Sequence, residues 1–358
     1  MTDPTPGTTP LPPVTAILAV RNDVETLEQA VQSIVDQNYP LAIDIVVAAA
    51  PSTDGTAELL TSLSAANPRL TVLHTTSVSQ VVALNEAIAA ARSSLIIRVD
   101  PRGALPTDYA VRAVETMVRT DAAALVGRAR PVGQTPFERA VAFGYRHRLG
   151  LAGDPLTSAA GEGPSHVAAA HVIRRRSFIE VGLYDEEIRH GQSWELNARL
   201  RAAGQTIWFT PSLMYRFRPP SKALALTRSL FAEGLWRGEF ARSFPESREL
   251  RFALPPVVVL ATILGFILGA GGLFGVVAGA IGVASVISFV LFALLIVPVA
   301  YVVSVIGLSI VVAARETLRV GVWFLLVLPF IHFCWGFGYL AGYLNIEGAA
   351  DTVIVDFD

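Results

Sequence analysis

Short apolar runs, separated by polar clusters, fill the first two thirds of the chain. Four of these runs have the length and composition of buried strands: 14–20, 43–48, 70–74 and 95–99. Between them, apolar residues recur at helical spacing in three segments: 26–37, 59–63 and 81–91. Because strands and helices alternate, the pattern predicts an α/β fold with a doubly wound, mainly parallel, Rossmann-like sheet.

The last third of the chain is strongly apolar and predicts membrane-spanning helices. No Asp, Glu, Lys, Arg or His occurs from Ala253 to Ala314, and a second apolar run extends from Val320 to Leu344. Since one transmembrane helix needs roughly 20 apolar residues, we expect three or four such helices within residues 252–345. The length of the first run favours three crossings there, whereas the charges of Arg315 and Arg319 favour two.

Charged residues beside the first apolar run indicate how the chain meets the membrane. Four arginines precede that run: Arg237, Arg242, Arg248 and Arg251. By the positive-inside rule they predict a cytoplasmic N-terminal domain in a multi-pass protein of the inner (plasma) membrane. The segment 221–251 mixes apolar and basic residues with Trp236, as in a helix that lies in the bilayer interface. A helix packed on the sheet of the N-terminal domain is the alternative.

The two ends of the chain lack apolar patterning. Residues 1–13 are rich in Pro and Thr, and we expect them to be disordered rather than a signal peptide, because they have neither a basic start nor an apolar core. Residues 346–358 form an acidic tail. The formal net charge of −2 gives no indication of nucleic-acid binding, and the single Cys334 allows no disulfide within the chain.

Small and polar residues in the apolar tail indicate contacts between helices. Glycines recur at intervals of four at Gly265 and Gly269 and again at Gly271, Gly275 and Gly279. This spacing favours close helix packing, and a membrane-protein partner is one candidate for the neighbouring helix. His332 lies within the last run, where we expect an interfacial or interhelical hydrogen bond; a functional role is the alternative.

Asp100 is the first candidate for chemistry, because it stands where a predicted buried strand ends. Pro101, Gly103 and Pro106 turn the chain directly after it. Open α/β sheets bind ligands beyond the carboxyl ends of their strands. Asp100 is therefore a candidate ligand-binding carboxylate, and a role limited to capping its own loop is the alternative.

An ordered series of short motifs makes the chain similar to a known family. The motifs cover roughly residues 14 to 240 and include Ala19-Val-Arg-Asn-Asp23, Ser52-Thr-Asp-Gly-Thr56, Arg98-Val-Asp100, Gly182-Leu-Tyr-Asp-Glu-Glu187 and Glu195-Leu-Asn-Ala-Arg199. In this order they resemble the inverting family-2 glycosyltransferases with a GT-A nucleotide-sugar domain, most closely the membrane-attached, succinoglycan-type ExoA-like branch. The resemblance implies a GT-A domain over 14–220, followed by the transmembrane region.

The resemblance also implies roles for residues at the strand ends. The donor, a nucleotide-diphosphate sugar, would lie against Ala19, Arg21, Asn22 and Asp54. Asp100 would be a carboxylate ligand of a divalent metal, Mg or Mn, which offsets the charge of the leaving diphosphate. The acceptor, a lipid-linked or cell-envelope glycan, would lose its proton to a carboxylate base, as inversion requires.

The chain departs from the family at positions that bear on this chemistry. Ala49 and Ala50 stand where the family often has aspartates, and Arg102 stands where the metal motif has an acidic residue or histidine. A guanidinium cannot ligate a metal, but it pairs bidentately with phosphate. Arg102 therefore either replaces part of the metal's charge or marks a site that binds no donor. A solvated loop arginine is the third reading.

The third departure falls on the base. Aligning Glu195 with the family motif places Ser193 at the position of the catalytic carboxylate. A serine hydroxyl needs an activating partner before it can act as a base near pH 7. Glu195 and His171 are the main candidates to replace it, beside Glu186, Glu187 and His190, and each of them also has a structural interpretation.

Two functions from different classes follow from these observations. The first is a membrane-bound inverting glycosyltransferase that uses a nucleotide-diphosphate sugar. The second is a catalytically inactive pseudo-glycosyltransferase, acting as a scaffold or regulator in a membrane complex of envelope biosynthesis. The ordered motifs favour the first, and the departures at Ala49, Ala50, Arg102 and Ser193 favour the second.

Overall fold

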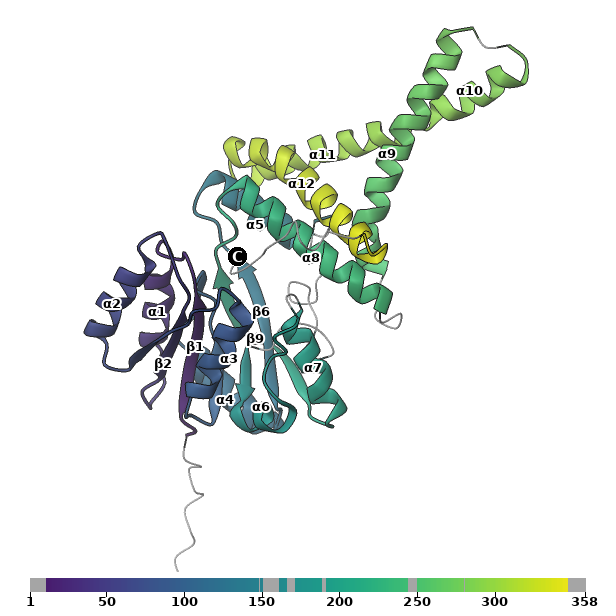
Figure 1. Ribbon diagram of the computed structural model, residues 1–358. Helices are drawn as coiled ribbons and strands as arrows, with labels where there is room; N and C mark the ends of the chain where they lie inside the picture. Colours follow the sequence, from purple (N-terminus) through teal and green to yellow (C-terminus); the bar gives the residue numbers. More distant parts are fainter. Residues whose placement is uncertain are drawn as a thin grey trace, which may run out of the picture. The chain divides into compact units, whose positions relative to one another are not determined.

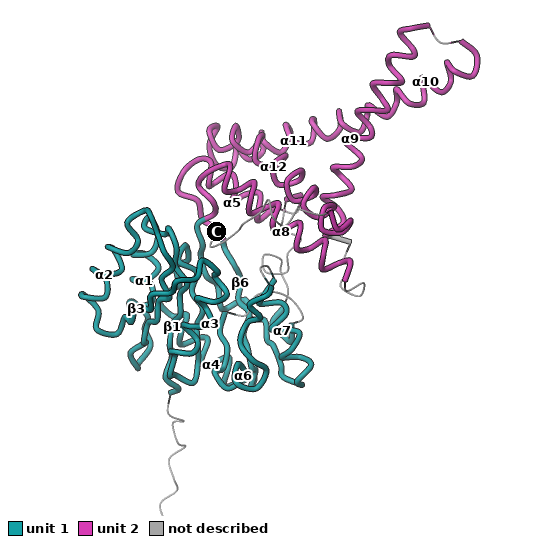
Figure 2. The backbone as a smooth tube through the Cα atoms, in the orientation of Figure 1, with its two compact units in different colours: residues 1–130, 154–218, 357 teal, residues 131–153, 219–356, 358 magenta. Residues whose placement is uncertain are grey.

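A computed structural model describes residues 11–147, 149–150, 161–165, 171–188, 191–243, 250–279 and 281–346. Apart from single residues at the C-terminus, the chain divides into two compact units (Figure 2). The first unit comprises residues 1–130 and 154–218, and the second comprises 131–153 and 219–356. Residues 1–10 and 347–358, which hold most of the expected disordered start and acidic tail, lie outside the described residues.

The first unit is built on a nine-stranded sheet (Figure 1). Its strands are β1 Val14–Val20, β2 Asp44–Ala49, β3 Leu70–His74, β4 Leu95–Arg98, β5 Gly103–Ala104, β6 Ala124–Pro131, β7 Gly163–Pro164, β8 Val172–Arg174 and β9 Ile207–Phe217. They lie in the order β3-β2-β1-β4-β8-β6-β9-β5, and β7 pairs with β9. The strands β1 to β4 are parallel to one another, whereas the pairs β4–β8, β6–β8, β5–β9 and β7–β9 are antiparallel.

Helices cover both faces of this sheet. They are α1 Leu27–Val35, α2 Thr56–Ala66, α3 Gln80–Ala90, α4 Tyr109–Thr120, α6 Arg175–Val181 and α7 Gln192–Ala202. Alternate residues of β1 enter two separate cores: Leu18 packs with α1 and α4, whereas Ile17 packs with α3, α6 and α7. All seven residues of β1 are buried, as in a central parallel strand. The predicted α/β fold with its mainly parallel sheet is confirmed.

The order of the strands creates a switch point in the sheet. The chain runs from β1 to β2 and β3 on one side, then returns to lay β4 against the other side of β1. The carboxyl ends of β1 and β4 therefore meet where the direction of winding reverses. In open α/β sheets this is the place where ligands bind.

The second unit is helical. Its helices are α5 Pro136–Arg146, α8 Ala223–Ser243, α9 Leu250–Val277, α10 Val283–Ala293, α11 Ile296–Arg315 and α12 Leu318–Tyr343. Three helical segments in the described residues are long and apolar enough to cross a membrane: 252–277, 283–315 and 318–343. This supports membrane association, while the number of crossings stays a prediction. A turn at Leu294 and Leu295 interrupts the segment 283–315.

Glycines bring α8 and α12 into close backbone contact. A Cβ atom on Gly234 or Gly238 of α8 would overlap a carbonyl oxygen of α12, and a Cβ on Gly338 or Gly342 of α12 would overlap one of α8. Both pairs have the four-residue spacing of closely packed membrane helices. The segment expected to lie in the bilayer interface thus packs along the last apolar helix, and its contact with lipid stays a prediction.

The glycines that the sequence singled out also have neighbours within the chain. Gly265 and Gly269 face the turn at Leu294–Leu295, and Gly275 faces Ser288 of α10. Only Gly271 and Gly279 of this set have open space around them in the described structure. Most of this glycine pattern therefore serves packing within the second unit and does not require a partner protein.

Candidate functional site

Hydrogen bonds of Asn22 and Asp54 hold together the two loops that follow β1 and β2. The Asn22 backbone N–H donates to Ser52 Oγ at 3.1 Å, and the Asn22 side-chain oxygen accepts from the Thr53 N–H at 2.9 Å. Asn22 has a positive φ of 55°, a conformation that asparagine tolerates. The carboxylate of Asp54 accepts from the N–H groups of Val24 and Thr56, at 3.1 and 3.0 Å. Asn22 and Asp54 thus fix the shape of the loops at the carboxyl ends of β1 and β2.

The charge state of Asp54 follows from these bonds. Burial raises the pKa of its carboxyl, but hydrogen bonds from Thr56 and Val24 act more strongly together and lower the pKa below its ordinary value. Both carboxylate oxygens accept hydrogen bonds within the loops. Asp54 therefore positions the loops. The helix α2 begins at Thr56, and its N-cap residue is Gly55, which has a positive φ of 95° and no capping side chain.

Asp23, Arg102 and Asp100 form a second group at the ends of β1 and β4. Asp23 is 6% exposed and accepts from the Arg21 N–H at 3.1 Å, and its other oxygen lies 3.6 Å from Nε of Arg102. Burial raises the pKa of Asp23 to about 6, against the opposing effects of the Arg21 N–H and the Arg102 guanidinium. Asp100 is exposed and accepts from the Arg102 N–H at 2.8 Å.

At the same edge of the sheet, Arg21 has a hydrogen-bond donor without a partner among the described residues. Its Nε atom is buried without a hydrogen-bond partner among the described residues, although the side chain as a whole is half-buried. A buried donor of this kind is costly unless a ligand or water satisfies it. Ala19, two residues earlier, is 2% exposed and packs in the core, so its side chain does not reach the edge.

Arg98 links the end of β4 to the start of α7. Its Nη1 donates to Ser193 Oγ at 3.1 Å, and its guanidinium carbon lies 5.7 Å from the centre of the Tyr184 ring. Its backbone N–H donates to the His171 carbonyl at 2.8 Å. In the part of the chain that the structure describes, no carboxylate forms an ion pair with Arg98. Ser193, which the sequence predicts to stand at the family's base position, therefore faces a cation.

Glu195 and His171 lie in different surroundings. Both oxygens of Glu195 accept from Arg199, at 2.5 and 2.7 Å, and Arg199 also donates to the carbonyl groups of Val181 and Leu183. Nε2 of His171 is buried and has no partner in the described ranges. Burial and the nearby charge of Arg98 lower the pKa of His171 to about 3, which makes its imidazole a weak base.

The role of Glu195, His171 or Ser193 as the base stays a prediction. Arg98 contacts Ser193 through its side chain and the His171 carbonyl through its backbone N–H. Glu195 forms an ion pair with Arg199 that stabilises the helix. His190, a further candidate, lies outside the described residues.

The carboxylates at the edge fit a metal only in part. The described residues contain no group of three or more His, Cys, Asp or Glu side chains that could hold an ion. Asp23 is buried beside Arg102, which leaves Asp100 as the accessible oxygen ligand. Mg²⁺ is commonly held by one or two carboxylates together with substrate phosphates and water. Asp100 is therefore the carboxylate of this edge that is open to a metal, and its role as a metal ligand stays a prediction.

The sequence motifs include two residues of this edge, Asp23 and Arg98, for which the sequence predicted no role. Asp23 ends the first motif and proves to be a buried carboxylate with a perturbed pKa. Arg98 is the charged last residue of an otherwise apolar strand, with burial falling only at that position. A charge at the end of a buried run was the signal that could have identified Arg98.

Comparisons with known proteins show the family of the chain. The family model described as glycosyl transferase family 2 matches residues 15–182. The succinoglycan biosynthesis protein ExoA of Rhizobium meliloti (strain 1021) is 33% identical over 248 residues, which are 68% of this chain and 74% of that protein.

One solved structure shares the fold at a TM-score above 0.5. The mannosyltransferase PcManGT from Pyrobaculum calidifontis, in complex with GDP-Man and Mn²⁺, has a TM-score of 0.54 at 15% identity and matches 96% of this chain and 91% of its own. TarS of S. aureus has a TM-score of 0.48 at 12% identity, and the match covers 65% of this chain but only 42% of TarS. The identity and coverage of the ExoA match, with the family model over the same sheet, show that the chain belongs to glycosyltransferase family 2, in its ExoA-like branch with a GT-A fold.

Proposed function

We propose that the chain transfers a sugar from a nucleotide-diphosphate donor to a lipid-linked or cell-envelope glycan acceptor, with inversion, in polysaccharide biosynthesis. The observation that carries the proposal is the group formed by Arg21, Asp100 and Arg102 at the switch point between β1 and β4. The name of the ExoA relative supports a role in polysaccharide synthesis, and the GDP-Man complex of PcManGT supports a nucleotide-sugar donor.

The donor half of the site would be cationic. Arg21 offers a buried Nε–H without a partner among the described residues, and Arg102 offers the remaining donors of a guanidinium that is 29% exposed. Guanidinium groups pair bidentately with phosphate oxygens. Asp100 would hold a divalent metal that enters with the diphosphate, and the metal would supply charge compensation for the leaving group. Asn22 and Asp54 would keep the loops in the shape that receives the nucleotide.

The acceptor half of the site would lie around Ser193. The Ser193 oxygen accepts from Arg98, so its own O–H remains available to donate to an acceptor oxygen. We assign Ser193 and Arg98 to orienting the acceptor. The candidates for proton removal are Ser193, Glu195 and His171, of which His171 is a weak base and Glu195 is paired with Arg199.

A second function is favoured by one observation. A cation faces the position at which the family has its base, which is unfavourable for proton removal but tolerable for a protein that only binds. The pseudo-glycosyltransferase would use the same edge to bind a nucleotide sugar and would act as a scaffold or regulator in the membrane.

The apolar helices support a membrane setting for either function. We propose a multi-pass protein of the inner (plasma) membrane with the first unit in the cytoplasm, based on the three apolar helices and on the arginines that precede them. In this arrangement the donor site would take its nucleotide sugar from the cytoplasm.

A transfer assay separates the two functions. The full-length protein in phospholipid vesicles is given radiolabelled UDP- and GDP-sugars with a lipid extract, and label in the lipid fraction is counted. The transferase predicts incorporation that Asp100→Asn abolishes and that Asp108→Asn, a change of an exposed carboxylate on the same unit, leaves intact. Binding of nucleotide without any incorporation would support the scaffold instead. The anomeric configuration of the product, measured by NMR, tests inversion.

A further inference from the structure

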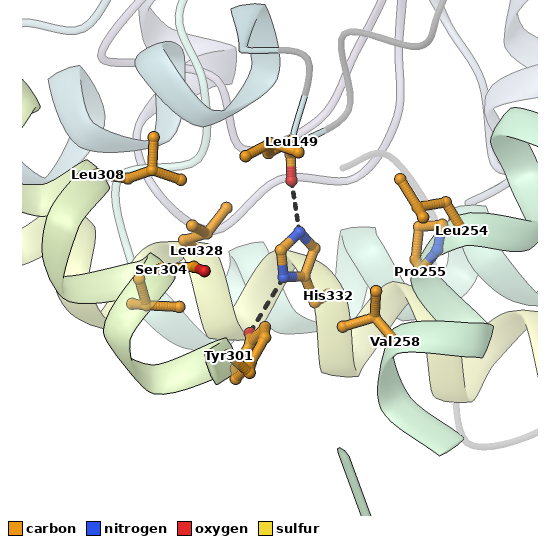
Figure 3. A pocket seen from close by; sticks show the side chains of 11 residues that line it. Leu149, Leu254, Pro255, Val258, Tyr301, Ser304, Leu308, Leu328 and His332 are labelled. Atoms are coloured by element: carbon orange, nitrogen blue, oxygen red, sulfur yellow. Dashed lines mark hydrogen bonds between the residues drawn. The ribbon is translucent and has the colours of Figure 1, made fainter. Parts of the chain in front are cut away.

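The helix α12 contacts other parts of the second unit at its start, middle and end. Just before it begins, Glu316 forms an ion pair with Arg139 of α5. In its middle, Nε2 of His332 donates to the carbonyl group of Leu149, in the turn that follows α5 (Figure 3). Near its end, Gly342 lies against the backbone of α8. Figure 1 shows α5 and α8 beside α12, so the surroundings of these two helices constrain where α12 can lie.

Short connections tie α5 and α8 to the sheet. Residues 132–135 connect β6 to α5, and residues 218–222 connect β9 to α8. Connections of this length reach about 20 Å at most, which is less than the roughly 30 Å of hydrocarbon in a bilayer. Both helices therefore begin on the same side of the bilayer as the first unit.

Charged residues keep α8 out of the bilayer interior. The helix has 21 residues and is therefore about 32 Å long, which is enough to cross. Charged residues occur, however, along most of its length: Arg228, Glu233, Arg237, Glu239 and Arg242. Three of them, Arg228, Glu233 and Arg242, are exposed. Because an exposed charge in hydrocarbon is strongly unfavourable, α8 fits an orientation along the membrane surface and not across it.

The second half of α12 shares the orientation of α8. Gly338 meets the carbonyl group of Phe231, and Gly342, four residues later, meets the carbonyl group of Leu235. A step of four residues on α12 thus corresponds to a step of four residues on α8, as in two helices that run parallel and close together. If α12 crossed the bilayer, the charged residues of α8 would enter the hydrocarbon beside it.

The middle of α12 is bonded to backbone that a bilayer interior does not accommodate. Leu149 lies in a non-helical turn just after Arg146 and is 46% exposed. Lipid-exposed irregular backbone does not occur within the hydrocarbon region, because its polar groups lack partners there. On the other side of the His332 ring, Nδ1 lies 3.0 Å from the hydroxyl group of Tyr301, which is the interhelical hydrogen bond expected for this histidine (Figure 3). The later part of α11 is therefore held beside α12.

The second half of α9, by contrast, forms with α10 a hairpin that extends away from α12 (Figure 2). Gly272 of α9 lies against Phe292 of α10, and Gly265 lies against Val297 at the start of α11. The hairpin contains no charged residue, and its arms, 260–277 and 283–300, each measure about 27 Å. This length is close to the roughly 30 Å of hydrocarbon, so one arm can carry the chain across a bilayer and the other can return it.

We infer that α12 lies in the lipid–water interface of the leaflet next to the first unit and does not cross the bilayer. The exposed residues of its central part are all apolar and face the acyl chains of that leaflet: Val322, Trp323, Leu325, Leu326, Phe330 and Phe337. The chain crosses through the hairpin of α9 with α10 and returns, so the end of α12 lies on the same side as the first unit. This placement holds for either of the two proposed functions.

Spin labels measure the depth of α12. Val322→Cys, Phe330→Cys and Phe337→Cys replace exposed residues in a Cys334→Ala background, and each cysteine receives a nitroxide. The full-length protein is placed in vesicles of phosphatidylethanolamine and phosphatidylglycerol, and the collision rates of each label with oxygen and with a nickel complex give its depth. We expect all three labels at similar depths of about 5–10 Å, because α12 runs parallel to the surface. Val290→Cys on α10 is the matched control, an exposed apolar position whose label should be the deepest.

The side of the membrane on which α12 ends is measured separately. Ala65→Cys, at an exposed position of α2, reports the side of the first unit, and Ile346→Cys reports the chain just after α12. Each variant, in the same Cys334→Ala background, is treated with a membrane-impermeant maleimide in sealed inverted vesicles and again after detergent. We expect the two cysteines to react under the same condition.

Either of two results would overturn the inference. A label at Phe330→Cys that lies near the bilayer centre, at about 15 Å and deeper than the other two, would show that α12 crosses. Reaction of Ala65→Cys and Ile346→Cys from opposite sides would show an odd number of crossings. Neither measurement depends on sugar transfer, so this placement and the proposed function can fail separately.

Discussion

Burial of the charged Asp23 carboxylate destabilises the folded first unit, and replacing Asp23 by asparagine should stabilise that unit at neutral pH. The side chain is 6% exposed, and burial raises its pKa from 3.8 to about 6. The difference of about 2.2 pH units corresponds to about 3 kcal/mol, at about 1.36 kcal/mol per unit. An asparagine at this position would keep the size of the side chain and an oxygen for the Arg21 N–H while removing the buried charge.

The sign of the pH dependence follows from the direction of the shift. Because the folded pKa lies above the unfolded one, the folded protein binds the proton more tightly. The stability that this protonation contributes is fully present below pH 3.8 and is lost as the pH rises through about 6. Asp23→Asn should therefore equal the unmodified protein near pH 4 and exceed it by up to about 3 kcal/mol at pH 7.5.

Thermal unfolding in detergent, followed by tryptophan fluorescence from pH 4 to pH 7.5, measures this difference. A change of 1 kcal/mol shifts the Tm of a domain of 150–250 residues by about 2–4 °C, so we expect a rise of about 6–12 °C at pH 7.5. Asp108→Asn, at an exposed carboxylate, is the control and should change little. A lower Tm for Asp23→Asn at pH 7.5 would refute the reasoning, because it would mean that the contact with Arg102 outweighs the cost of burial.

Three further predictions concern the acceptor side and the helix pair. Ser193→Asp should raise sugar transfer about tenfold in the vesicle assay. This is less than the rate gain of about 10²–10⁴ from a general base, because Arg98 lowers the basicity of the new carboxylate. An unchanged rate would show that a carboxylate at position 193 does not take the proton. Glu195→Gln should cost about 1 kcal/mol of stability in denaturant unfolding and leave transfer nearly unchanged, whereas a hundredfold loss of transfer would identify Glu195 as the base. Gly338→Ala should destabilise the second unit by about 1–3 kcal/mol, because its Cβ would overlap the Phe231 carbonyl; Gly271→Ala, with open space around it, is the control, and equal thermal shifts would contradict the packing account.

The four parallel strands of the sheet could be predicted from the sequence, and three short antiparallel strands could not. The expected runs 14–20 and 70–74 coincide with β1 and β3, and the other two expected runs differ from their strands by one residue at each end or at one end. These strands are local, apolar and separated by helices. By contrast β5, β7 and β8 are two or three residues long and depend on pairing with distant strands. No periodicity exists in so short a segment.

The packing of the second unit also could not be predicted from the sequence pattern. The segment 136–146 has polar residues and begins with a capping box between Thr135 and Glu138, as in a helix of the soluble part. Its Phe137 nevertheless packs in the core formed with α12. The close contact between α8 and α12 depends on glycines of two distant segments, and only their approach in space distinguishes them from the glycines of α9.

The position of the candidate residues at strand ends could be predicted from the sequence, but the contacts of their side chains could not. The position of Asp100 at a strand end follows from the pattern and from the switch point. The pairing of Arg102 with Asp23, of Arg98 with Ser193 and of Glu195 with Arg199 depends on rotamers and distances that no spacing encodes. These contacts decide which groups are available for chemistry.

Nucleotide binding tests the central claim, that the switch point between β1 and β4 is a donor site. The full-length protein in detergent is titrated calorimetrically with UDP, GDP and their sugars, with and without Mn²⁺. We predict binding that Mn²⁺ strengthens, that Asp100→Ala reduces at least tenfold and that Asp108→Ala leaves unchanged. The absence of binding for every nucleotide, or binding that is indifferent to both Asp100→Ala and Arg102→Ala, would contradict the account.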